Sequence, residues 1–316
     1  MICFHKCNKN FILVVTFLFS LNVFANDTSL LKTADTIDKN LFYRIDTPPR
    51  QVYKINIAGT LIAGVAATAA NIIAINNIIH NKPDLTLEEV QAVNRNSVNR
   101  FDRWALDLDP TKRDKNYARS DHVLTGIFAM SGASILLNKD TRKDWLRLAL
   151  MYYQTQFVTF AVYDFSPFGP TFQNKLRPVV YYSYFPIELR RRGNQKNSFY
   201  SGHVANATSA TFFAVKVFSD YHPELGRKKY LLYGLASIPP LVNGWLRIKA
   251  LAHFPSDVLA GYLIGGAFGI LIPELHRIKG PRLQLNTYFD GYSKGMQLTW
   301  NIAPRKRELK PEILLR

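Results

Sequence analysis

Cysteine is almost absent from the 316-residue chain: there are two, Cys3 and Cys7, and both lie at its very start. Residues 1–25 have the pattern of a secretory signal, in which an apolar core from Phe11 to Phe24 is followed by the small residue Ala25. If this signal is cleaved, the mature chain has no cysteine, which excludes disulfides and thiolate chemistry there. The alternative is that the segment stays as an uncleaved membrane anchor.

Acidic residues are also scarce, since 23 of them face 40 lysines and arginines, for a net charge of +17. Removing Lys6 and Lys9 from the +17 chain with the signal would still leave +15, so the basicity belongs to the mature protein. Such an excess favours an anionic partner, which is a nucleic acid, an anionic lipid or a phosphorylated substrate. Composition does not choose among the three.

Internal repeats and low-complexity segments are missing, and long uncharged runs take their place. The 25 residues from Ile55 to Ile79 carry no charge and are long enough to span a bilayer, although four asparagines weaken that reading. We expect further apolar helices at Val123–Leu137, Trp145–Val162, His203–Val217, Tyr230–Leu246 and Val258–Pro273. The sequence therefore predicts an all-α fold, a bundle of about six helices embedded in a membrane.

Two stretches differ from these apolar runs. Thr86 and Glu89 have the spacing of a capping box, which predicts a helix from there to Leu106. Beyond the last apolar helix, hydrophobic residues alternate with polar ones on both sides of a glycine-containing turn, which predicts a short C-terminal β-hairpin. We divide the chain into a signal at 1–25, an arm with the first apolar helix and the charged segment at 26–121, a helical core at 122–278, and the hairpin with a basic tail at 279–316.

Three polar clusters separated by apolar helices are the candidates for chemistry. They are Lys175-Leu-Arg177-Pro178, then Tyr200-Ser201-Gly202-His203, then Arg247 followed by His253 and Asp257. A Ser-Gly-His that opens a helix can bind phosphate, because glycine lets the backbone approach a ligand and the free N–H groups of the helix point outward. Each cluster alone is weak, but together they supply the cations, imidazoles and carboxylate of one phosphoryl-transfer reaction.

In this order the clusters resemble those of the type 2 phosphatidic acid phosphatase (PAP2) superfamily, which also contains bacterial acid phosphatases and vanadium haloperoxidases. The family pattern is Lys-x6-Arg-Pro, then Pro-Ser-Gly-His, then Ser-Arg-x5-His-x3-Asp, and the resemblance covers about residues 123–275. The chain departs from it at Pro170, which stands in place of the first lysine, at Tyr200 in place of proline, and at Leu246 in place of serine. Lys175 is the nearest lysine that could replace the missing one.

The resemblance implies a role for each matching residue. His253 would attack phosphorus while Asp257 holds its other N–H, and His203 would donate a proton to the leaving oxygen. The cations and donors that bind the phosphoryl group would be Arg177, Arg247, Lys175, Ser201 and Gly202. No metal or other cofactor is required. Since Pro255 suits the first turn of a helix, the last apolar helix should begin there.

The leading interpretation is a metal-independent phosphatase of a lipid phosphate or diphosphate that acts through a phosphohistidine. A lipid phosphotransferase with the same site, or a phosphate-lipid binding protein impaired by the missing lysine, are the alternatives. The expected partners are the phosphorylated lipid and a membrane. A nucleic acid is not expected, because it would leave the apolar helices unexplained.

The expected location is a bacterial cell envelope, with the site facing the periplasm. One conflict stands against this. Three apolar helices precede Arg177, so an exported N-terminus would place the site in the cytoplasm if all three spanned the membrane. Either one apolar segment does not span, or the bundle is not a standard six-span protein.

Overall fold

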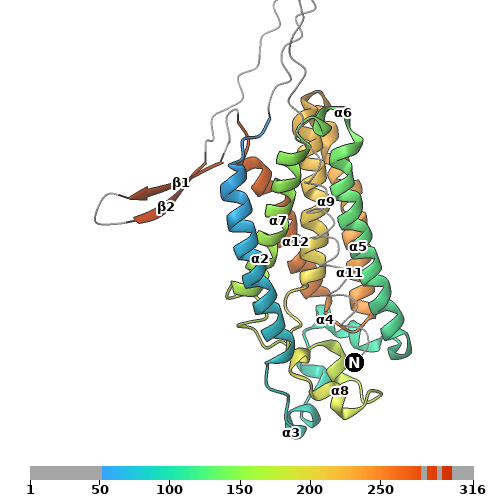
Figure 1. Ribbon diagram of the computed structural model, residues 1–316. Helices are drawn as coiled ribbons and strands as arrows, with labels where there is room; N and C mark the ends of the chain where they lie inside the picture. Colours follow the sequence, from blue (N-terminus) through green and yellow to red (C-terminus); the bar gives the residue numbers. More distant parts are fainter. Residues whose placement is uncertain (1–51, 279–282, 290–293, 301–316) are drawn as a thin grey trace, which may run out of the picture. The chain divides into compact units, whose positions relative to one another are not determined.

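The computed structural model describes residues 52–278, 283–289 and 294–300. The predicted signal, most of the N-terminal arm and the basic tail lie outside these residues. Within them the chain forms helices and one two-stranded sheet, so the all-α class is confirmed (Figure 1).

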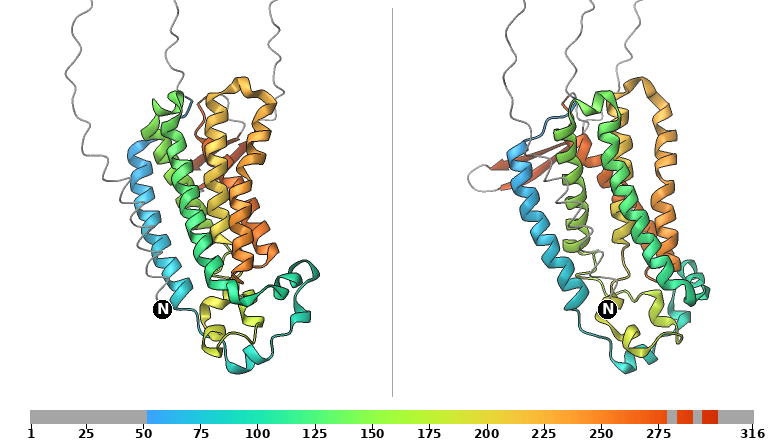
Figure 2. Two further views of the ribbon diagram at one scale, coloured as in Figure 1. Left: turned by 90° about the vertical axis from the view of Figure 1, so that its right-hand side faces the viewer. Right: turned by 45° about the vertical axis from the view of Figure 1, so that its right-hand side comes forward.

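The long helices of the described chain run alongside one another in Figures 1 and 2. They are α2 (Ile57–His80), α5 (Arg113–Leu137), α7 (Trp145–Phe165), α9 (Gly202–Tyr221), α11 (Ile238–Lys249) and α12 (Pro255–Leu275). The shorter helices are α3 (Leu87–Gln91), α4 (Arg100–Arg103), α6 (Lys139–Arg142), α8 (Ile187–Arg191) and α10 (Lys229–Ala236). Single 3₁₀ turns are η2 (Arg95–Ser97), η3 (Trp104–Asp107), η4 (Pro110–Lys112), η5 (Pro178–Tyr181), η6 (Gly193–Lys196) and η7 (Pro223–Lys228). Strands β1 (Leu283–Phe289) and β2 (Lys294–Trp300) pair antiparallel, as the alternation predicted.

The charged segment before α5 differs from the prediction of one helix up to Leu106. The capping box of Thr86 and Glu89 forms as expected, but helix α3 ends after five residues. Asn94 and Asn99 then accept hydrogen bonds from backbone N–H groups as the caps of η2 and α4. Asparagine side chains compete with helical hydrogen bonds in this way, so the segment forms short turns instead of one helix.

Two of the apolar helices also begin or end at residues that differ from the prediction. Helix α5 begins at Arg113, ten residues before the expected start, and crosses the expected boundary after residue 121. The run from Tyr230 to Leu246 is divided into α10 and α11, because Pro239 and Pro240 occupy the first turn of α11.

Helix α2 packs against α7 despite its asparagines. A Cβ atom at Gly64 would lie 2.5 Å from the ring of Tyr153, so the two helices approach closely there. Asn71 is buried and its amide donates to the backbone oxygen of Phe157 on α7 at 3.0 Å. A polar side chain that joins two helices is compatible with an apolar span.

Helix α9 packs against α5, α7, α11 and α12, and its closest partner is α12. A Cβ atom at Gly265 of α12 would lie 2.0 Å from the backbone oxygen of Ala205 on α9. A Cβ atom added at Gly261 would lie 2.5 Å from the backbone oxygen of Ser201. These glycines let the N-terminal ends of α9 and α12 lie side by side, and that is where two of the three motifs are found.

Three helices of the described chain are long and apolar enough to cross a membrane. They are Ile57–His80, Pro110–Leu137 and Pro255–Leu275. Large apolar side chains such as Ile62, Ile73 and Leu263 are exposed on them, as expected for surfaces that face lipid.

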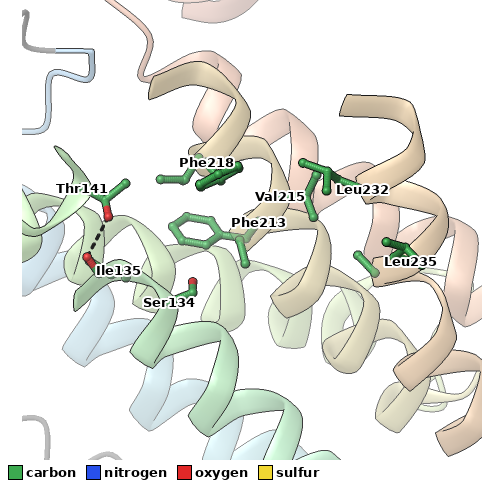
Figure 3. A pocket seen from close by; sticks show the side chains of 11 residues that line it. Ser134, Ile135, Thr141, Phe213, Val215, Phe218, Leu232 and Leu235 are labelled. Carbon is green, nitrogen blue, oxygen red and sulfur yellow. Dashed lines mark hydrogen bonds between the residues drawn. The ribbon is translucent and has the colours of Figure 1, made fainter. Parts of the chain in front are cut away.

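A cavity of about 330 Å³ lies between α5, α9 and α10, mostly lined by apolar side chains such as Phe213, Phe218 and Leu232 (Figure 3). None of its lining residues belongs to the three motifs, and those from α9 lie ten or more residues along the helix from His203. We therefore look for the site at the other end of α9.

Candidate active site

The three motifs meet at one end of the helical bundle, where α9 and α12 begin and α11 ends. The segment with α3 and α4, together with the segment with α8, covers this end (Figure 1). Pro255 is the first residue of α12, as predicted, with His253 just before the helix and Asp257 in its first turn.

His253 is buried, with an exposed fraction of 2%. Its Nδ1 lies 2.7 Å from the backbone oxygen of Ser198, so Nδ1 carries the proton and Nε2 keeps a free lone pair. Burial, followed by the positive charges of Arg247 and Arg177, lowers the pKa of His253 well below its ordinary value. The imidazole is therefore neutral near pH 7, as a nucleophile must be.

Asp257 does not accept the N–H of His253, so that part of the expected arrangement is wrong. One of its oxygens accepts from the Ser198 hydroxyl at 2.6 Å and from the backbone N–H of Phe254 at 2.8 Å. A carboxylate in the first turn of a helix reaches back to the N–H at the cap, and this geometry turns Asp257 away from the ring. The carbonyl of Ser198 therefore accepts a hydrogen bond from His253, and the hydroxyl of Ser198 donates one to Asp257.

Lys175 is held by carboxylates. Its ammonium lies 2.7 Å from Asp257 and 3.1 Å from Asp102, and it donates to the Ser256 hydroxyl at 2.9 Å. The expectation that Lys175 replaces the missing phosphate-binding lysine gains no support from these contacts. They make it the counter-ion of two buried acids.

Arg177 and Arg247 are both buried, with exposed fractions of 9% and 1%. The guanidinium carbon of Arg247 lies 4.2 Å from the centre of the Tyr117 ring, and Nε of Arg177 donates to the backbone oxygen of Asn197 at 3.3 Å. Within the described residues, the carboxylate of Asp121 pairs with Arg247 at 3.6 Å, and Nε of Arg247 has no hydrogen-bond partner. Two buried guanidinium groups near one carboxylate make the site attractive to an anion.

His203 stands on the first turn of α9 and pairs with Asp121 of α5, which lies 3.0 Å from its Nε2. Its other ring nitrogen, Nδ1, has no hydrogen-bond partner among the described residues. Asp121 thus orients the ring, and Nδ1 is the atom that can give a proton to a bound group when the ring is protonated. Burial and then the charge of Arg247 lower the pKa of His203, while the hydrogen bond and charge of Asp121 act in the opposite direction.

Ser201 is the N-cap of α9, and its buried hydroxyl has no partner within the described chain. A Cβ atom at Gly202 would lie 3.0 Å from the Tyr163 ring, so this position is tight for a larger side chain. Tyr200, which replaces the family proline, is fully buried and packs edge-on against Tyr163, with ring centres 5.3 Å apart. The departure from the family pattern at this position is a core contact.

The structure brings His253, His203, Arg177 and Arg247 to one end of the bundle, as the motifs predicted, and adds residues that sequence reasoning missed. Tyr117, Ser120 and Asp121 come from the first turns of α5, and Ser120 accepts from Arg247 at 3.2 Å. The spacings of three and four residues place all of them on one helix face. This polar face directly before an apolar run was the available signal. Asp102, also missed, has no such mark.

A sequence model of the PAP2 superfamily matches residues 146–280. No curated protein matches the chain. Among solved structures, a transmembrane PAP2-type phosphatidylglycerolphosphate phosphatase from Bacillus subtilis matches with 18% identity, covers 68% of this chain and 93% of that one, and gives a TM-score of 0.38.

The matched residues begin in α7, and they include all three motifs. Helices α2 and α5 and the turns between them lie before the match, so Asp102, Tyr117 and Asp121 come from outside it. Residues 146–280 are therefore similar to the PAP2 superfamily, whose pattern the three motifs resemble.

Proposed function

We propose that the protein hydrolyses a phosphate or diphosphate ester of a membrane lipid, without a metal ion, through a phosphohistidine on His253. The observation that carries this proposal is the environment of that ring. Its Nδ1 donates to the carbonyl of Ser198 at 2.7 Å, and burial, followed by the charges of Arg247 and Arg177, lowers the pKa of the ring and favours its neutral form. Both features favour attack by Nε2 on an anionic phosphoryl group.

The first step forms a bond between Nε2 of His253 and phosphorus and breaks the bond from phosphorus to the lipid oxygen. His203 in its doubly protonated form gives its Nδ1 proton to that oxygen and becomes neutral, so the lipid alcohol, or lipid monophosphate for a diphosphate, leaves neutral at this atom. Arg177 and Arg247 offset the charge on the equatorial oxygens in the transition state, which is the work that a metal ion does in other phosphatases.

The second step restores the enzyme. Neutral His203 takes a proton from water as the water oxygen bonds to phosphorus. The bond from phosphorus to His253 breaks, and inorganic phosphate leaves. An alcohol that replaced water here would give a phosphotransferase, so the products of a reaction with an acceptor lipid distinguish the two activities.

The proposal of a lipid substrate rests on the position of the site. It lies at the end of helices that are long and apolar enough to cross a membrane. A phosphorylated headgroup could reach this end while its tails stay beside exposed apolar side chains of α2 and α12. Phosphatidic acid, phosphatidylglycerol phosphate, undecaprenyl diphosphate and lipid A are the candidates to test.

The experiment is phosphate release by the purified full-length protein in mixed micelles with each of these four lipids. We expect release from at least one lipid, loss of more than about 10³-fold in His253→Ala, and loss of about 10²–10⁴-fold in His203→Ala. His222→Ala is the matched control, since His222 caps the opposite end of α9. No release from any lipid, or a fully active His253→Ala variant, would contradict the proposal.

A further inference from the structure

Asp102 lies in the short helix α4, outside the part of the chain that matches the family, and its side chain is fully buried. It receives four hydrogen bonds or ion pairs at 2.6–3.1 Å, from the Ser256 backbone N–H and hydroxyl, the Asn99 amide and the Lys175 ammonium. Two of these come from the first turn of α12, directly beside Asp257. The short helix α4 thus holds the first turn of α12, which carries Asp257.

Lys175 connects Asp102 to Asp257. Its ammonium lies between the two carboxylates, at 3.1 Å from the first and 2.7 Å from the second, and both carboxylates are fully buried. Such a buried arrangement is stable only when the charges compensate one another. Burial raises the pKa of Asp102, but the hydrogen bonds from Ser256 and Asn99 and the charge of Lys175 more than offset this and lower it overall. Asp102 is therefore ionised and acts as the second counter-ion of Lys175.

The contacts continue from Asp257 to the nucleophile. Asp257 accepts the hydroxyl proton of Ser198 at 2.6 Å, and the backbone oxygen of the same serine accepts the Nδ1 proton of His253 at 2.7 Å. Asp257 also holds the backbone N–H of Phe254, the residue that follows His253, at 2.8 Å. The position of the ring is thus set from two sides by one carboxylate.

We propose that Asp102 and Lys175 are positioning residues, which fix Asp257 and, through Ser198 and Phe254, hold the His253 ring in line with the phosphoryl group. This inference rests on the proposed function. It assigns Lys175 a different task from the phosphate-binding lysine of the family pattern, and it makes the segment before α5 a part of the active site.

The test compares Asp102→Asn with Asp107→Asn in the full-length protein. Asn keeps the shape of Asp but removes the charge that faces Lys175. Asp107 lies five residues along the same segment, where it is exposed and paired with Arg95. We expect Asp102→Asn to lower kcat about 10-fold or more with KM changed less than about twofold, because a misplaced nucleophile affects the transition state and not substrate binding. Asp107→Asn should stay within about twofold of wild type in both.

A double variant gives a readout that a merely structural role would not move. If Asp102 acts through Lys175, the loss in Asp102→Asn with Lys175→Gln is smaller than the product of the two single losses. If Asp102→Asn does not fold, Ser256→Ala, which removes one hydroxyl from the same cluster, should lower kcat by a smaller factor, again with KM unchanged. An unchanged kcat in a folded Asp102→Asn or Ser256→Ala variant overturns the inference, as does a Lys175→Gln variant with raised KM and normal kcat.

Orthovanadate, which mimics the five-coordinate transition state when it bonds to the nucleophile, separates this inference from the proposed function because its binding needs a correctly placed His253 but no turnover. We expect Asp102→Asn to weaken vanadate binding, measured by calorimetry, at least fivefold, and Asp107→Asn to leave it unchanged. If wild type releases no phosphate, the proposed function fails, and the vanadate series still decides about Asp102. If wild type is active and Asp102→Asn binds vanadate normally, only the positioning role fails.

Discussion

Single residues set the charge state of the proposed nucleophile. His253 must be unprotonated to attack, and its surroundings favour that form: burial first, then the charges of Arg247 and Arg177, lower its pKa well below the ordinary value. Because the pKa in the folded protein is depressed, the active form is present above that pKa and is lost as pH falls through it. The acid limb of kcat that belongs to His253 should therefore lie below about pH 6.5, the ordinary histidine value.

Replacing Arg247 by Gln tests this account of the pKa. Without the cation the pKa of His253 rises, so the acid limb of the pH–rate profile moves to higher pH. The loss of transition-state stabilisation lowers kcat/KM about 10²-fold or more. The profile is measured for wild type, Arg247→Gln and the control Arg227→Gln, which changes an arginine in η7 at the other end of α9. An acid limb that stays in place in Arg247→Gln would show that this charge does not set the pKa.

The motif residues were predictable from the sequence because their order and spacing carry the pattern, and the structure brings them together. The partner of His253 was not predictable. It depends on the backbone between η6 and α9, which places the carbonyl of Ser198 and not a carboxylate against the ring. Asp102 was missed because it reaches the site from a short helix where no local spacing marks it, whereas Asp121 belongs to a polar face that precedes the apolar run of its helix.

At the level of secondary-structure elements, the approach of α9 to α12 holds the two histidines that we propose as catalytic in one place. His203 opens α9 and His253 precedes α12, so any separation of these helix ends changes the distance between acid and nucleophile. The approach depends on glycines whose missing side chains leave room for the backbone of the neighbouring helix.

Gly265→Ala should therefore destabilise the protein. The added Cβ would lie 2.0 Å from the backbone oxygen of Ala205, so the helices must move apart. We expect a loss of about 1–3 kcal/mol in the free energy of unfolding, or more, seen as a lower Tm in detergent. Gly126→Ala on α5 is the control, because nothing lies within 4 Å of its added Cβ, and its Tm should stay equal or rise. Equal Tm values for the two variants would contradict close packing at Gly265.

The number and approximate place of the apolar helices followed from hydrophobic runs, but several of their ends did not. Helix α5 begins ten residues before the predicted start. The prediction missed these residues because Tyr117, Ser120 and Asp121 face the site and not lipid or solvent. A helix that turns a polar face toward an active site has no apolar stripe there, so periodicity cannot detect its first turns.

For the whole molecule, the ends of the bundle carry different charge densities. The short connections at the end away from the site hold Lys139, Arg142 and Lys143 before α7, and Arg227 and Lys228 before α10. The connections at the site end, residues 81–112 and 166–201, hold eleven lysines and arginines, so the count of basic residues does not by itself favour a site that faces the periplasm, and this orientation stays a proposal.

Val52, just before α2, lies at the same end as these basic loops, since its carbonyl accepts from the backbone N–H of Ile278 after α12. If α2 spans the membrane, a periplasmic site and an exported, cleaved signal at residues 1–25 exclude each other. A site that faces the periplasm therefore requires that the chain before α2 stays in the cytoplasm.

Labelling of single cysteines measures this topology. In a variant with Cys3→Ser and Cys7→Ser, we expect Asp107→Cys at the site end to react with a membrane-impermeant maleimide on intact cells. Lys143→Cys at the other end should react only after lysis. Both native side chains are exposed, at 69% and 61%, so access to the reagent is limited only by the membrane. The reverse labelling would place the site in the cytoplasm.

The central claim is that the chain forms a covalent phosphohistidine at His253. The most direct measurement is rapid denaturation during turnover of a ³²P-labelled lipid phosphate that the protein hydrolyses, followed by peptide mapping. We expect label on the peptide that contains His253, stable to alkali and labile to acid, and none in His253→Ala. Rapid release of phosphate by wild type with no labelled protein at any time, or equal label in His253→Ala, would contradict the claim.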